Sequence, residues 1–218
     1  MKTPSAKAFT LVELLAVIFV VVFLAVLLLP SLAHRGPATG IVCINNQHQI
    51  ATGLFVWSLD HANKFPWQVA STNGGALEAA IRGYAAPNFQ CLSNYTSGAT
   101  MIYICRADTN RVAAKNIAQL RNLNISYFIS FDSGTEASAS ILTGDRNLAH
   151  DGNPLYAGLY ICTPTSKMNW TRGLHTTNPK WAIGALSFID GHAEMVKDAD
   201  LNSVFLRENL ATNRLCIP

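Results

Sequence analysis

A single carboxylate, Glu13, stands at the head of a long apolar run. Residues 14–33 carry no charged side chain, and Phe9 precedes Glu13 by four residues, so a helix places the two on one face, one turn apart. A bilayer-spanning helix needs roughly 20 apolar residues, and an acidic group within one is costly enough to mark a functional site. The segment therefore predicts a transmembrane helix over residues 9–33, with Glu13 as its functional residue.

A second set of residues that could take part in chemistry lies near the C-terminus. His175, Asp190 and His192 are of the types that bind metals or act as acids and bases. Asp190 also precedes Gly191 between two extended apolar runs, and Asp-Gly is a strong signal for a hairpin turn. Two interpretations remain open: a structural turn, or the site of an exported enzyme or of a metal- or ligand-binding domain.

A third polar group surrounds Asp145, His150 and Asp151. Oxygen-rich loops bind calcium, although the acidic spacing here is sparser than in a dedicated calcium loop. A polar surface loop is the default interpretation of this group. Asp145 and Asp151 are the candidate metal ligands, calcium is the candidate ion, and no other cofactor is expected.

The five cysteines are Cys43, Cys91, Cys105, Cys162 and Cys216. Their odd number leaves at least one thiol without a partner in the chain, and none forms the Cys-x-x-Cys spacing of a zinc or redox motif. Cys91 and Cys105 are the closest pair in sequence and are the candidate disulfide.

Composition and motifs exclude several classes of protein. The net charge is +3 with 13% charged residues, and no basic run is dense enough for binding nucleic acid. The chain contains no nucleophile elbow, phosphate-binding loop or zinc-protease motif. We therefore expect that the protein is not an enzyme.

Elements that position these residues can be expected from the apolar pattern. Helical spacing resumes at Ile41 and stops before Pro66, so residues 34–63 predict a polar continuation of the first helix, broken at Gly36-Pro37. Residues 64–218 predict a head domain. Within it we expect helices over 76–86, 113–123 and 198–210, strands over 100–105, 126–131 and 140–144, and a hairpin of 182–189 with 192–196. The fold class is α+β, with a long N-terminal hydrophobic helix followed by a helix packed on an antiparallel sheet.

Residues 7–15, Lys-Ala-Phe-Thr-Leu-Val-Glu-Leu-Leu, resemble the processing and methylation site of type IV prepilins and type II secretion pseudopilins. His175 followed by Asp190-Gly191 resembles an element near the C-terminus of many prepilin-like proteins. The resemblance implies that residues 1–8 are a leader, that a prepilin peptidase cleaves between Ala8 and Phe9, and that Phe9 is then methylated. It further implies that Glu13 pairs with the amino terminus of a neighbouring subunit.

The expected function is that of a structural subunit of a type IV pilus-like or type II secretion pseudopilus filament. The implied partners are the prepilin peptidase, other pilin or pseudopilin subunits, an inner-membrane assembly platform and the membrane itself. Lys2 and Lys7 favour a cytoplasmic N-terminus. The expected location is therefore a single pass through the inner membrane with a periplasmic head, or an extracellular filament.

Overall fold

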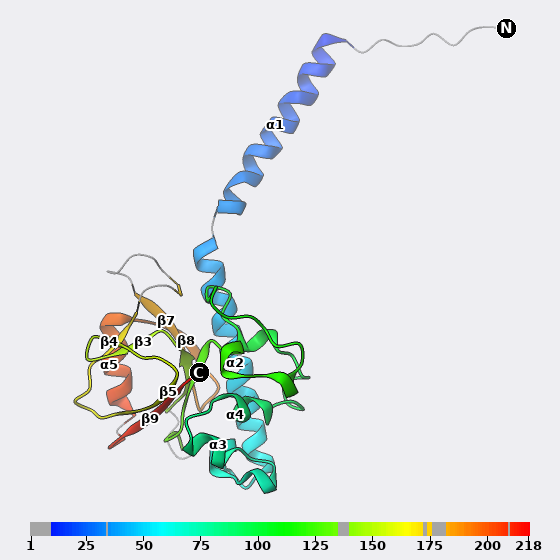
Figure 1. Cartoon of the computed structure of the whole chain (residues 1–218). Helices are drawn as coiled ribbons and strands as arrows, with labels where there is room; N and C mark the ends of the chain where they lie inside the picture. Colours follow the sequence, from blue (N-terminus) through cyan, green and yellow to red (C-terminus); the bar gives the residue numbers. More distant parts are fainter. Residues whose placement is uncertain (1–9, 34, 135–139, 172–173, 176–181, 209) are drawn as a thin grey trace, which may run out of the picture. The chain divides into compact units, whose positions relative to one another are not determined.

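The computed structural model describes residues 10–33, 35–134, 140–171, 174–175, 182–208 and 210–218, and it leaves the side chains of residues 25–38 undescribed. The chain divides into two compact units, residues 1–38 and residues 39–218, and each is treated by itself. The first unit contains α1 (Leu11–Ala33) and the start of α2 (Arg35–Asp60), and the second contains the rest of α2 and the head (Figure 1).

The prediction of a transmembrane helix over residues 9–33 is wrong, and so is the single-pass inner-membrane location drawn from it. Within the described part of the chain, no helix combines the length and the apolar character that crossing a membrane requires.

The second helix begins earlier than the sequence pattern predicted. Gly36 and Pro37 lie in the first turn of α2, where a proline costs no hydrogen bond because the first N–H groups of a helix have no partner within it. Gly36 and Pro37 thus lie within α2 (Arg35–Asp60), and residue 34 lies outside the described residues. At its other end α2 stops at Asp60, and Ala62 and Asn63 then adopt the left-handed backbone conformation.

A largely irregular segment of short helical turns follows α2. Its elements are η1 (Pro66–Gln68), η2 (Ser71–Asn73), α3 (Leu77–Ile81), α4 (Ala86–Gln90), η3 (Met101–Tyr103), η4 (Ile117–Gln119) and η5 (Asn122–Asn124). The helices expected over 76–86 and 113–123 are thus each replaced by two shorter elements. The strand expected over 100–105 is wrong, since Ile102 and Tyr103 form a helical turn buried in the same cluster as the inner face of α2.

Two antiparallel sheets form the rest of the head. The six-stranded sheet has the order β5-β9-β1-β2-β7-β8, and the three-stranded sheet has the order β4-β3-β6. The strands are β1 (Tyr127–Ser130), β2 (Ile141–Asp145), β3 (Leu148–His150), β4 (Asn153–Pro154), β5 (Gly158–Cys162), β6 (Met168–Trp170), β7 (Ile183–Phe188), β8 (Ala193–Lys197) and β9 (Asn213–Ile217). The predicted strand pair over 126–131 and 140–144 is confirmed by β1 and β2, and the predicted hairpin by β7 and β8. The expected C-terminal helix is α5 (Asp198–Arg207).

Both faces of the six-stranded sheet are covered, whereas the sequence suggested one helix on one face. Side chains alternate along β1: Tyr127 and Ile129 join the cluster that contains the inner face of α2, and Phe128 joins the cluster that contains α5. Figure 1 shows α3 and α4 beside α2, and α5 beside the three-stranded sheet. Burial on both faces explains why every residue of β1 and of β2 is buried.

Candidate functional site

Glu13 forms a closed hydrogen-bonded unit with Thr10 at the start of α1. Its Oε2 atom accepts hydrogen bonds from the Thr10 backbone N–H at 2.9 Å and from the Thr10 hydroxyl at 2.7 Å, while the Glu13 N–H donates to Thr10 Oγ1 at 3.3 Å. This is the capping box of a Thr-x-x-Glu sequence. The hydrogen bonds from Thr10 lower the pKa of Glu13, so the head of α1 carries a negative charge at neutral pH. Ala8 and Phe9, the predicted processing residues, lie outside the described residues.

Beyond Glu13, the described part of the α1 surface is apolar on every side, as far as Leu24. All described side chains from Leu11 to Leu24 are exposed, with Leu11 at 75% and Phe19 at 71%. Phe19 and Phe23 stack along one face, with ring centroids 6.3 Å apart. A helix that is apolar all round is stable in water only when it is buried on all sides.

A buried cluster of two thiols, an imidazole and a carboxylate lies inside the head. Cys43 comes from α2, Cys105 follows η3, Asp145 ends β2 and His175 precedes β7. Cys43 Sγ lies 2.7 Å from Cys105 Sγ, which in turn lies 3.7 Å from His175 Nε2. The possible metal-ligating atoms of Cys43, Cys105 and His175 all lie within 4.8 Å of one another.

Asp145 connects His175 to the backbone of the sheet. Its Oδ2 atom accepts hydrogen bonds from His175 Nε2–H at 2.8 Å and from the Ala185 backbone N–H at 2.6 Å. Both side chains are almost completely buried. Within the described part of the molecule, Asp145 Oδ1 and His175 Nδ1 are buried without a hydrogen-bond partner. Such unpaired atoms are uncommon in protein interiors and call for an explanation.

The contacts of the cluster shift the pKa values of its members in opposite directions. The hydrogen bond from Cys105 lowers the pKa of Cys43, whereas donating that bond, together with burial, raises the pKa of Cys105. Burial acts to lower the pKa of His175, but the hydrogen bond to Asp145 and the contact with Cys43 raise it to about 10. The cluster therefore combines a Cys43 thiol of lowered pKa with an imidazole of raised pKa.

This arrangement suits metal binding better than nucleophilic catalysis. In a nucleophile–histidine–carboxylate triad, one ring nitrogen faces the carboxylate and the other faces the nucleophile. Here Nε2 faces both Asp145 and Cys105, and Nδ1 has no partner among the described atoms. Cys43 and Cys105 are also fully buried, which keeps a substrate away from either sulfur.

The other predicted C-terminal residues form a turn and not a site with His175. Asp190 Oδ1 accepts a hydrogen bond from the His192 backbone N–H at 3.1 Å and lies 2.8 Å from His192 Nδ1, and both side chains are about half exposed. The His192 ring stacks on Phe188. Only Gly191 of the Asp-Gly pair has a positive φ. Asp190 and His192 therefore stabilise the β7–β8 turn.

The remaining predicted site residues are separated by the fold. Asp151 lies in the exposed turn between β3 and β4, where its Oδ1 accepts a hydrogen bond from the Lys167 N–H at 3.0 Å and its Oδ2 lies 3.6 Å from His150. Asp145 is buried with His175 instead. The five thiols are free, and the sulfur of Cys91 contacts the Gly74 and Pro87 carbonyl oxygens, so the structure brings Cys105 to Cys43 and not to Cys91.

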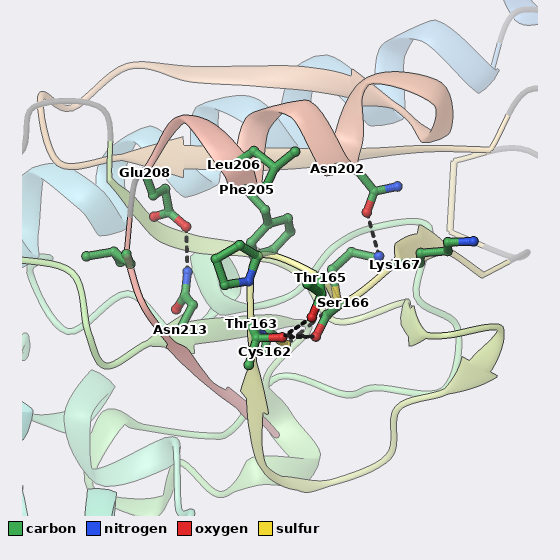
Figure 2. A pocket seen from close by; sticks show the side chains of 13 residues that line it. Cys162, Thr163, Thr165, Ser166, Lys167, Asn202, Phe205, Leu206, Glu208 and Asn213 are labelled. Carbon is green, nitrogen blue, oxygen red and sulfur yellow. Dashed lines mark hydrogen bonds between the residues drawn. The ribbon is translucent and has the colours of Figure 1, made fainter.

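A cavity of about 330 Å³ lies between α5 and the turn that joins β5 to β6 (Figure 2). Several of its polar side chains already have partners in the protein. Thr163 Oγ1 bonds to the hydroxyls of Thr165 and Ser166, and Asn202 Oδ1 accepts a hydrogen bond from the Met168 N–H at 2.7 Å. Glu208 accepts hydrogen bonds from Ile141 and Asn213. The cavity therefore offers few free groups to orient a ligand.

The chain matches no protein-family model, no curated protein and no solved structure. The basis for assigning a function is thus the two features that the structure defines. One is the apolar helix with Glu13 at its head, which the sequence predicted as a functional segment. The other is the buried cluster around Cys43, which sequence reasoning missed because Cys43 fits the apolar face of α2.

Proposed function

We propose that this protein is a structural subunit of a pilin-like filament and that copies assemble through α1. The observation that carries the proposal is the exposure of apolar side chains all round that helix from Leu11 to Leu24. A dimer interface would cover one stripe of a helix, whereas a filament core surrounds each helix with several others. The apolar surface of α1 matches the second arrangement.

The head supports the same role because it satisfies its own core. Residues 39–218 pack as a separate unit, and both faces of the six-stranded sheet are covered from within that unit. The head therefore needs no part of residues 11–24 for its own core. Because the head buries its own core, α1 is available for contacts between subunits.

Glu13 supplies a specific contact at the start of the helix. Its carboxylate is ionised and is oriented by Thr10. After cleavage between Ala8 and Phe9, the new amino group of an adjacent subunit is the cation that pairs with it. Such a pair is stronger in an apolar filament core than in water, and leaving either charge unpaired there is costly. The partners of the chain are then a prepilin peptidase, an assembly platform and further pilin-like subunits.

The experiment compares filament formation by the wild-type chain and by Glu13→Gln, each produced with a prepilin peptidase. Pelleted filaments are quantified and examined by electron microscopy. Glu13→Gln keeps the shape of the side chain and removes its charge. We expect at least about a tenfold loss of pelleted protein, which corresponds to a weakening of subunit association by about 1.4 kcal/mol.

Glu78→Gln is the matched control, because Glu78 also lies in the first turn of a helix and accepts a backbone hydrogen bond, from Ser71 at 2.9 Å. It should assemble normally. Filaments of Glu13→Gln in wild-type amounts would contradict the role of Glu13, and the absence of filaments from the processed wild-type chain would contradict the proposed function.

A further inference from the structure

We propose that Cys43, Cys105 and His175 bind one zinc ion in the interior of the head, with Asp145 positioning the imidazole. Two thiolates and an imidazole are ligands that Zn²⁺ takes in tetrahedral sites, where the fourth position can hold water. The site lies wholly within residues 39–218, so it is independent of assembly through α1.

The geometry is close to that of a bound ion. Zinc–sulfur bonds of roughly 2.3 Å and zinc–nitrogen bonds of roughly 2.0 Å hold the donor atoms of a tetrahedral site about 3–4 Å apart. Cys105 Sγ lies 3.7 Å from His175 Nε2, within this range. The two sulfurs, now 2.7 Å apart, would separate by about 1 Å to receive the ion.

Asp145 holds the imidazole beside the two sulfurs. Its Oδ2 accepts a hydrogen bond from the Ala185 N–H and lies 2.8 Å from His175 Nε2. A carboxylate in contact with a metal-binding histidine is common in zinc sites, where it fixes the orientation of the ring. When zinc binds, the protons on the ligand atoms pass to solvent.

A disulfide between Cys43 and Cys105 is the competing explanation for their contact. It would use the two sulfurs alone and would leave the imidazole of His175 facing an uncharged group. The convergence of two thiols and an imidazole from three separate segments is what favours an ion. Such a site would fix α2 to the segments around Cys105 and His175, which no continuous element connects.

The first experiment measures metal bound to the full wild-type chain, purified under reducing conditions and equilibrated with zinc. We expect one zinc per chain by elemental analysis, and we expect Co²⁺ in its place to give the intense visible absorption of tetrahedral cobalt with sulfur ligands. Thiol titration of the unfolded, metal-free protein should find five thiols. A zinc content near zero, or three thiols in place of five, would overturn the proposal in favour of a disulfide or an empty cluster.

The second experiment compares Cys43→Ser and His175→Gln with two control variants. Cys91→Ser and Cys162→Ser remove thiols that lie elsewhere, against Pro87 and Met168 respectively. We expect the first pair to lose zinc affinity by about tenfold or more and the controls to keep it, with the fold of each checked by circular dichroism. Because the cobalt spectrum of the wild-type chain reports sulfur ligands directly, a variant that fails to fold still leaves the proposal open to refutation. Equal zinc affinity in all four variants would overturn it.

Discussion

His175 and Asp145 form a buried pair in which Nε2 lies 2.8 Å from Oδ2, although 30 residues separate the two in sequence. The carboxylate also receives the N–H of Ala185, which anchors it to β7. The pair is therefore a fixed part of the sheet interior, and it orients the imidazole toward the two buried sulfurs. Changes to either residue should affect both the stability of the head and the chemistry of the cluster.

We expect Asp145→Asn to lower the free energy of unfolding of the metal-free chain by about 2–4 kcal/mol, because it removes one charge of a buried pair and leaves the other uncompensated. Urea denaturation in the presence of a chelator measures the change. Asp151→Asn is the control, since Asp151 is 56% exposed and asparagine suits its positive φ. A change below about 0.5 kcal/mol for Asp145→Asn would show that the buried pair is not needed for stability.

Gly144→Ala should destabilise the head by about 1–3 kcal/mol, the usual cost of overpacking a core. A β-carbon at position 144 would lie 2.4 Å from Leu186 Cδ2 and 2.5 Å from Phe128 Cε1, between the side chains of two neighbouring strands. Gly134→Ala is the matched control because a β-carbon there meets no atom of the described residues within 4 Å. Thermal unfolding of the two variants measures the difference, and equal melting temperatures would refute the close approach of β1, β2 and β7.

Glu208 should make the head less stable as the pH rises from about 4.5 to about 7. Burial raises the pKa of Glu208 to about 7, outweighing the hydrogen bonds from Ile141 and Asn213 that act to lower it. Because the native state then holds a proton that the unfolded state releases near its ordinary pKa of 4.5, stability is highest at low pH and falls until pH 7. The difference is on the order of 3 kcal/mol.

Glu208→Gln should remove this pH dependence while leaving that of the other groups in place. The measurement is the difference between the unfolding free energies of the wild-type chain and of Glu208→Gln at pH 5 and at pH 8. If the unfolding free energies of the two chains change equally between pH 5 and pH 8, the carboxyl group of Glu208 has an ordinary pKa in the native state.

Assembly through a filament core predicts that α1 is sensitive to polar substitution on all of its faces. Leu15, Val20 and Val21 point in directions roughly evenly spaced around the helix, and all three are exposed. Each change to asparagine should reduce filament yield without unfolding the head, as judged by pelleting and circular dichroism. A reduced filament yield in only one of the three variants would instead indicate that α1 makes contact on one side, as in a dimer.

The parts of the fold that the sequence predicted are the local ones. The β7–β8 hairpin follows from Asp190-Gly191 between two extended runs, and α5 follows from its apolar spacing with Asp198 at its start. The segment over 100–105 was expected to be a strand because of its Ile and Tyr residues. Those residues are apolar because they pack in the core that includes α2, and packing overrode the strand preference.

The buried cluster could not be predicted because its members meet only through the tertiary fold. Cys43 and Cys105 are 62 residues apart, and nearness in sequence pointed instead to Cys91. Asp145 was a candidate ligand for calcium in a surface loop, yet it lies inside the sheet beside nitrogen and sulfur donors. His175 was grouped with His192 through its position in the sequence, although the strands carry the two residues to different environments.

The most direct test of assembly through α1 is the protection of a thiol on that helix. Ile18→Cys and, as control, Ile81→Cys on α3 are each made in a Cys91→Ser background, since Cys91 is the native cysteine that is not fully buried among the described residues. Maleimide labelling rates are measured in pelleted filaments. The account predicts at least about a tenfold slower reaction at position 18 and unhindered reaction at position 81. Equal labelling at the two positions would contradict it.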